Sequence, residues 1–144
     1  MTEVLIMADD RKKIIIVEDE FTFAKVIKLR LESCGYDVEI AGDAYQGTQS
    51  IISKKYDLII LDLMMPAGGG YSLLDRIRKL PQKSAIPVII VTGKHLDEND
   101  EAAVQALDVS AIFSKPYDTS VFLNTVMNLV PVYSQNEALI CYQQ

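Results

Sequence analysis

Four short apolar runs in this sequence are each followed at once by residues that could do chemistry. These residues are, in chain order, Glu18-Asp19-Glu20, Asp62, Thr92-Gly93 and Lys115-Pro116. In an open parallel sheet, functional groups gather beyond the carboxyl ends of the strands. If the four runs are parallel strands, then carboxylates, a hydroxyl and an ammonium meet in one crevice.

Such a crevice needs positive charge. Two carboxylates about 4 Å apart repel each other by roughly 4 kcal/mol at an effective dielectric of ~20, and proteins relieve this by raising a pKa or by binding a cation. Glu18, Asp19 and Asp62 carry about −3, and Lys115 with a divalent ion about +3. Oxygen ligands with no His or Cys nearby favour Mg²⁺, Ca²⁺ or Mn²⁺, and a site with several waters suits Mg²⁺ best.

The same residue types suit phosphoryl transfer to an aspartate. Asp62 would attack phosphorus in line, while the metal and Lys115 neutralise the phosphoryl oxygens. The Thr92 hydroxyl would hydrogen-bond one of these oxygens, and Gly93 would leave space for the group to enter. The residues therefore predict an aspartyl-phosphate site.

The elements that must position these residues alternate along the chain. Apolar runs without polar alternates are typical of strands buried on both faces of a parallel sheet. Strict alternation with helices predicts an α/β, doubly wound, five-stranded parallel sheet with five helices. The expected strands are 14–17, 36–41, 58–61, 87–91 and 111–113, and the expected helices 21–34, 43–54, 71–80, 97–107 and 118–130. Residues 1–12 and 132–144 are expected to be tails, which leaves one domain over 13–131.

Three local expectations follow from residue types. In the first helix, Val26 and Leu29 count among the apolar residues at helical spacing, and Gly35 stands where a C-terminal cap belongs. Pro66 and the following glycines predict a loop that extends through Gly70. In the helix expected over 97–107, the apolar side comprises Ala102, Ala103, Val104 and Leu107.

Composition excludes several classes of function. The chain has 144 residues, 49% of them hydrophobic, and a net charge of −6. An acidic chain is a poor match for nucleic acid or an anionic membrane, and no apolar run approaches the ~20 residues that span a bilayer. The N-terminus does not look like a secretory signal, and Cys34 and Cys141 are expected to be reduced thiols of a cytoplasmic protein.

Four segments together resemble the receiver domain of bacterial two-component response regulators; they are residues 14–20, 58–66, 91–93 and 114–117. The resemblance implies a flavodoxin-like strand order of 2-1-3-4-5. It implies that Asp62 takes a phosphoryl group from the phosphohistidine of a sensor histidine kinase or a histidine phosphotransfer protein. Asp19, Asp62 and the backbone carbonyl of Met64 would hold Mg²⁺, with Glu18 acting through water.

The resemblance also implies an output. Phosphorylation would shift the surface of the fourth helix, fifth strand and fifth helix toward a downstream protein or an output domain, and the chain would do no chemistry beyond accepting and slowly losing the group. Ile112 departs from the family, which usually has Tyr or Phe there to swing inward as Thr92 engages the phosphate. Phe113 is no substitute, because neighbours on a strand face opposite sides. Gly69 replaces a frequent aspartate, which suggests a mobile loop.

Alternatives remain open at this point. Ile112 and the glycines also suit a phosphorylation-independent interaction module with the same fold. A phosphohydrolase with an aspartyl nucleophile is a third possibility, although such enzymes usually place an aspartate where Met64 stands. The chain is either a stand-alone receiver or the front of a longer regulator. Its apolar segment 138–142 would pack on the domain or on a second copy, making a homodimer.

Overall fold

The computed structural model describes residues 11–66, 69–93 and 95–132, and strands alternate with helices along them. The elements are β1 (Lys13–Val17), α1 (Phe21–Ser33), β2 (Asp37–Ala41), α2 (Ala44–Ser53), β3 (Leu58–Leu61), α3 (Gly69–Lys79), β4 (Val88–Thr92), α4 (Glu98–Gln105), β5 (Ala111–Ser114) and α5 (Thr119–Leu129). All strand pairs are parallel, in the order β2-β1-β3-β4-β5. The predicted fold class and strand order are confirmed.

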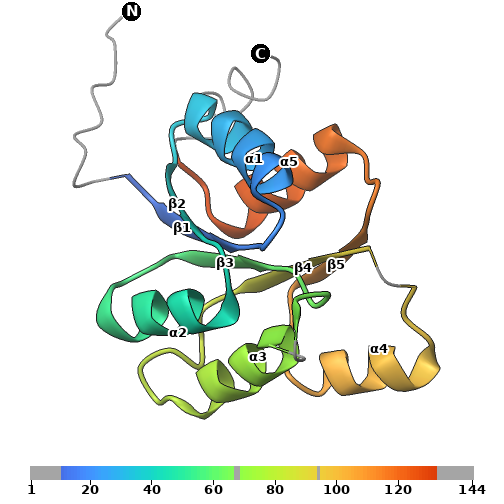
Figure 1. Ribbon diagram of the computed structural model, residues 1–144. Coiled ribbons are helices and arrows are strands. Elements are labelled where there is room, and N and C mark those ends of the chain that lie inside the picture. The colour runs from blue at the N-terminus through green and yellow to red at the C-terminus, as the bar shows by residue number, and fades with distance from the viewer. Residues whose placement is uncertain (1–10, 67–68, 94, 133–144) are drawn as a thin grey trace, which may run out of the picture.

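The sheet is the middle of three layers. Helices α1 and α5 cover one face, and α2, α3 and α4 cover the other (Figure 1). Side chains alternate between two apolar cores: Ile14 and Ile16 of β1 face α1 and α5, whereas Ile15 and Val17 face α2 and α3. Every residue of β3 and β4 is buried, which explains why these strands lack polar alternates.

The apolar face expected for α1 was too broad. The helix buries Ala24, Ile27 and Leu31, whereas Val26 and Leu29 are 52% and 58% exposed. Buried positions spaced by three and four residues make one narrow stripe, and Val26 and Leu29 lie off it. The helix ends as predicted, with Gly35 just beyond it at a φ of 99°, a left-handed conformation that favours glycine.

The sequence predicted a loop that extends through Gly70, but α3 already begins at Gly69. The predicted end of the loop is therefore wrong. A Cβ atom at Gly69 would lie 2.6 Å from the Ala44 Cβ, and one at Gly70 would lie 2.6 Å from the Asp62 carbonyl oxygen. These glycines therefore let the start of α3 approach α2 and the end of β3. Gly69 is thus a helical residue in close contact with Ala44, and the suggestion that it belongs to a mobile loop is wrong.

Helix α4 is shorter and less buried than its sequence suggested. It begins after Asp97, whose carboxylate accepts a hydrogen bond from the Asp100 N–H at 2.8 Å, while Asp100 accepts one from the Asp97 N–H at 3.2 Å. Of the residues expected on its apolar side, Val104 is buried, but Ala102 and Ala103 are exposed. Small alanine side chains tolerate either environment, so their spacing alone was a weak signal.

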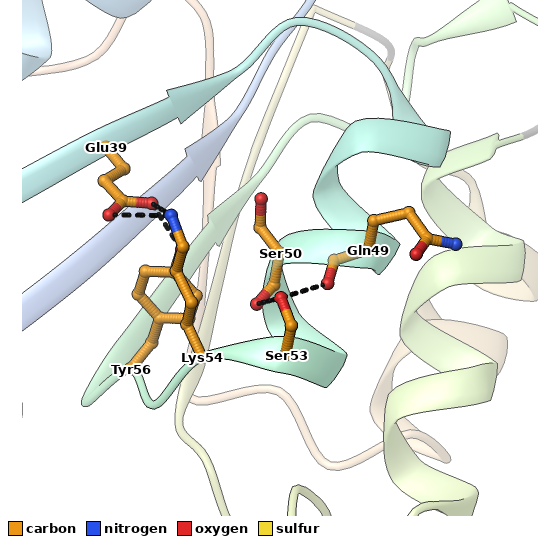
Figure 2. A network of polar contacts seen from close by, with 6 residues as sticks. All are labelled: Glu39, Gln49, Ser50, Ser53, Lys54 and Tyr56. Carbon is orange, nitrogen blue, oxygen red and sulfur yellow. Dashed lines mark hydrogen bonds and ion pairs between the residues drawn. The ribbon is translucent and has the colours of Figure 1, made fainter.

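A polar network joins the β2 edge of the sheet to the segment after α2 (Figure 2). The Tyr56 hydroxyl donates to Glu39 Oε2 at 2.5 Å, and Lys54 Nζ lies 3.2 Å from the same oxygen. The Tyr56 hydrogen bond, with Lys54 assisting, lowers the pKa of Glu39 despite its partial burial. Burial and the Glu39 carboxylate raise the pKa of Tyr56, so this hydroxyl remains a donor.

Within the described residues, no helix has the length and apolar character needed to cross a bilayer. Cys34 is buried and makes no disulfide. Cys141, segment 138–142 and most of both predicted tails lie outside the described residues, so the expected dimer contact stays a prediction, as do the domain limits of 13 and 131.

Candidate functional site

Three carboxylates meet where β1 and β3 end. Glu18 and Asp19 follow β1, and Asp62 follows β3; the two strands are neighbours with Val17 paired to Leu61. One carboxylate oxygen from each of the three residues lies within 4.8 Å of the others. Glu18 is 2% exposed and Asp62 4% exposed, while Asp19 faces solvent. The structure therefore brings together the acidic residues that the strand-end argument singled out.

Lys115 reaches the same cluster from the segment between β5 and α5. Its ammonium forms a close ion pair with Glu18 and lies 3.6 Å from Asp62 Oδ2 and 3.9 Å from Glu20 Oε2. The side chain is 17% exposed. One positive charge thus faces three carboxylates, of which Glu18 and Asp62 are shielded from water.

The charges in this site shift the pKa values of their owners. Burial is the main cause that raises the pKa of Glu18 to about 8, with Asp62 adding to the rise and Lys115 opposing it. Burial lowers the pKa of Lys115, but the Glu18 hydrogen bond and charge, with Asp62 and Glu20, outweigh this and raise its pKa overall. The raised pKa of Lys115 shows that its ammonium lies among surplus negative charge, whereas for Glu18 the nearby Asp62 only adds to the effect of burial.

The backbone around Asp62 fixes the position of its carboxylate. Its Oδ1 accepts a hydrogen bond from the Met64 N–H at 2.9 Å, and its own N–H donates to the Val17 carbonyl at 3.0 Å. Oδ2 faces the Lys115 ammonium. Met64 therefore contacts Asp62 through its backbone, and its side chain is 52% exposed. The Mg²⁺-ligand role of the Met64 carbonyl stays a prediction.

Thr92 and Gly93 stand at the end of β4, next to β3. Thr92 is fully buried, and its carbonyl accepts a hydrogen bond from the Lys115 N–H at 2.9 Å. A Cβ at Gly93 would meet nothing within 4 Å. The space around Gly93 is thus open, as expected for a residue that would leave room for an entering group.

Ile112 and Phe113 face opposite sides of β5, as the alternation of a strand predicts. Ile112 pairs with Ile90 and packs against the core that also holds Val104 of α4. Phe113 packs on the other face, where its ring lies 5.3 Å from that of Phe122 in α5. No aromatic ring of β5 therefore faces α4.

Sequence reasoning missed two contributors to the site. The Phe23 ring in α1 has its centroid 4.1 Å from Lys115 Nζ, a contact that the sequence did not predict. Gly70 was assigned to a loop, although its bare backbone lies against Asp62. Phe23 follows the acidic residues after β1 by only three positions, counted from Glu20. This short spacing was the only feature of the sequence that could have placed the ring near the site.

The donor set fits a hard divalent cation. Glu18, Asp19 and Asp62 offer only oxygen atoms, which suits Mg²⁺ bound largely through carboxylates and water. A cation here would also offset the Asp62 charge that adds to the rise in the Glu18 pKa.

Comparison with known proteins identifies the family. The model of the family described as "Response regulator receiver domain" matches residues 14–127. The chain belongs to the response regulator receiver domain family. Receiver domains generally bind Mg²⁺ at an acidic pocket, and this receiver domain has an acidic cluster of Glu18, Asp19 and Asp62.

Relatives of this receiver domain include longer regulators. It is 40% identical over 111 residues to the response regulator ArlR of Staphylococcus saprophyticus, covering 77% of this chain and 49% of that protein. It is 32% identical over 117 residues to the probable transcriptional regulator ycf29 of Porphyra purpurea, covering 81% and 56%. The receiver domain thus spans about half the length of these curated relatives.

Solved receiver domains share its fold. A CheY-like receiver domain protein from Methanospirillum hungatei superposes with a TM-score of 0.76 at 28% identity, covering 82% of this chain and 92% of that one. The signal receiver domain of a histidine kinase from Syntrophus aciditrophicus gives a TM-score of 0.75 at 29% identity, covering 86% and 93%. In two-component signalling, response regulator receiver domains interact with histidine kinases and output domains.

Proposed function

We propose that Asp62 is the phosphoryl acceptor of this receiver domain, taking the group from the phosphohistidine of a sensor histidine kinase or a histidine phosphotransfer protein. The observation that carries the proposal is the environment of the Asp62 carboxylate, with Oδ1 held by the Met64 N–H at 2.9 Å and Oδ2 lying 3.6 Å from Lys115 Nζ. One oxygen is thus fixed, and the other lies beside a cation.

The reaction at Asp62 is an in-line displacement. A carboxylate oxygen forms the new bond to phosphorus as the phosphorus–nitrogen bond of the phosphohistidine breaks, and that electron pair leaves with the imidazole. The Lys115 ammonium, which already lies among carboxylates, neutralises charge on the transferred group. The Thr92 hydroxyl, at the end of the adjacent strand, donates to a phosphoryl oxygen in the phosphorylated state.

Asp19, Asp62 and the Met64 carbonyl would hold Mg²⁺, with Glu18 acting through water. The ion supplies positive charge that screens the carboxylates from one another and from an incoming anion. Asp19 is the solvent-facing member of the cluster, so it is the ligand that an entering hydrated ion meets first. The chain does no chemistry beyond accepting the group and slowly losing it.

The signal leaves through the surface of α4, β5 and α5, in the cytoplasm, toward a downstream protein or an output domain. Phosphorylation adds about −1 to a near-neutral loaded site, which favours a state with Thr92 drawn inward. A full shift from 1:99 to 99:1 needs roughly 5.5 kcal/mol of differential interaction. Since Ile112 replaces the usual aromatic switch, we expect a partial shift that a partner completes.

The proposal is tested by phosphorylation with a small donor. Phosphoramidate or acetyl phosphate with Mg²⁺ should add one phosphoryl group to the wild-type chain, as detected by intact mass, and Asp62→Asn should abolish it. Asp75→Asn is the control, since Asp75 is a half-exposed residue of α3 that pairs with Lys79. Undiminished modification of the Asp62→Asn protein would show that Asp62 is not the acceptor.

Ile112 supports a second candidate, an interaction module that works without phosphorylation. Its aliphatic side chain packs against the α4 side of the sheet, where it cannot act as an aromatic rotamer switch. A receiver domain that binds no Mg²⁺ at millimolar concentration, or whose partner binding is the same with and without phosphorylation, would favour this function over the first.

A further inference from the structure

The ring of Phe23 in α1 lies against the ammonium that the proposed phosphoryl transfer uses. The distance from Lys115 Nζ to the ring centroid is 4.1 Å. A cation within about 6 Å of an aromatic centroid is attracted to the ring face, and the attraction strengthens as water is excluded. The Lys115 side chain is only 17% exposed, so we expect the attraction between its ammonium and the ring to be stronger than at an exposed site.

The ring attracts the ammonium without adding charge to the site. The other groups around Lys115 Nζ are the carboxylates of Glu18, Glu20 and Asp62. A further carboxylate in place of the ring would also attract the ammonium, but it would repel an incoming phosphoryl group. The quadrupole of a neutral ring avoids this conflict.

The Phe23 ring is itself held in place by other aromatic side chains. Its centroid lies 5.9 Å from that of Tyr117, with the ring planes at 88°. The Tyr117 ring centroid in turn lies 4.9 Å from that of Phe122. Phe122 is 1% exposed and belongs to the core between the sheet and α5. The contact with Lys115 is therefore made by a ring anchored to the core, although α1 is otherwise exposed on its outer side.

We infer that Phe23 is a positioning residue for phosphoryl transfer: its ring holds the Lys115 ammonium beside the attacking carboxylate of Asp62, 3.6 Å away. The inference rests on the proposed function of Asp62. It gives α1 a role in the reaction in addition to the roles of the charged residues at the strand ends. Phe23 acts through Lys115 and takes no part in bond making or breaking.

A side chain that merely fills the core would behave differently from a positioning residue. Loss of core packing affects the protein in the same way whichever residue stands at position 115, whereas positioning requires the ammonium. The test is therefore a double-mutant cycle with Phe23→Leu, Lys115→Ala and the double variant. The rate of phosphorylation by phosphoramidate at saturating Mg²⁺ is measured by intact mass, and urea denaturation reports the stability of each protein.

We expect Phe23→Leu to slow phosphorylation about threefold to thirtyfold when Lys115 is present, and to have little effect in the Lys115→Ala background. Phe23→Tyr keeps an aromatic face and should restore the rate. Phe21→Leu is the matched control: Phe21 lies in the same helix, is 62% exposed, and has its ring 5.8 Å from Lys25 Nζ. Its substitution should leave the rate unchanged.

Equal slowing in both backgrounds, no slowing by Phe23→Leu, or no rescue by Phe23→Tyr would overturn the inference while leaving Asp62 as the acceptor. A wild-type chain that takes no phosphoryl group at Asp62 would instead overturn the proposed function, and this inference with it. If the Lys115→Ala proteins react too slowly to be timed, the cycle is measured instead as the affinity of the same four proteins for beryllofluoride with Mg²⁺, by fluorine NMR. We again expect Phe23→Leu to weaken this affinity when Lys115 is present and to have little effect in the Lys115→Ala background.

Discussion

The backbone of Gly70 lies directly against the backbone of Asp62. A Cβ atom at position 70 would stand 2.6 Å from the Asp62 carbonyl oxygen and 2.8 Å from the Leu63 Cα. Both of these atoms belong to the main chain at the end of β3, so neither can move aside as a flexible side chain could. The start of α3 thus sets the position of the proposed phosphoryl acceptor through a contact that glycine alone permits.

Replacing Gly70 by alanine should therefore damage both the fold and the site. Alanine favours a helix over glycine by about 1 kcal/mol, but overpacking against rigid atoms destabilises by about 1–3 kcal/mol, so we expect a net loss of stability. Phosphorylation of Asp62 should slow as well, because its backbone is displaced. Urea denaturation and intact-mass kinetics measure the two effects.

Gly42→Ala provides the control for this substitution. A Cβ at Gly42 would meet only the Gln46 side chain, at an ordinary 3.9 Å. We expect Gly42→Ala to change neither the phosphorylation rate nor, by more than about 0.5 kcal/mol, the stability. A Gly70→Ala protein as stable and as reactive as wild type would show that the contact with Asp62 is not tight.

Asp19 should control the Mg²⁺ requirement. Asp19→Asn removes one anionic oxygen from the group of three carboxylates, and Mg²⁺ binds carboxylates far better than amides. We expect the Mg²⁺ concentration for half-maximal phosphorylation to rise about tenfold or more, as measured by the rate of modification across a Mg²⁺ titration.

Glu20→Gln separates this effect from a general loss of negative charge. Glu20 is adjacent in sequence and 3.9 Å from Lys115, but it is not one of the three clustered carboxylates. Its substitution should shift the Mg²⁺ titration by less than about threefold, as expected for an exposed charge. Equal shifts in the two variants would argue against Asp19 as a ligand.

The Glu39–Tyr56 contact predicts a pH-dependent part of the stability. The Tyr56 hydrogen bond lowers the folded-state pKa of Glu39 below its usual 4.5. A lowered pKa means that the contribution to stability is fully present above about pH 4.5 and is lost as the pH falls through the folded-state value. Since Glu39 is 43% exposed, we expect the contribution to be at most about 1 kcal/mol.

Glu39→Gln should thus be less stable than wild type near pH 7, and the difference should shrink toward about pH 3. Urea denaturation followed by circular dichroism at several pH values measures it. Glu32→Gln, at an exposed position of α1, controls for the loss of a surface charge. A deficit of Glu39→Gln that stays constant with pH would contradict the assignment.

The sequence by itself determined the α/β architecture and the set of charged residues at the site. Apolar runs such as Leu58–Leu61 are typical of strands covered on both faces, and Leu58–Leu61 is such a strand; alternation with helices favours parallel pairing of these strands. Residues directly after parallel strands share one edge of the sheet, so the meeting of Glu18, Asp19 and Asp62 followed from chain order and the resemblance to receiver domains. The sequence also located the starts of the last two helices to within one residue, at Asp97 and Asp118.

Only the tertiary structure decided which atoms approach these charges from other elements. The Phe23 ring reaches Lys115 from α1, and Gly70 reaches Asp62 from α3, because of the way each helix lies on the sheet. Helical spacing says which residues share a face, but the depth and angle at which that face packs depend on all the side chains beneath it. For the same reason Val26 and Leu29, which spacing placed on the apolar face of α1, lie in solvent.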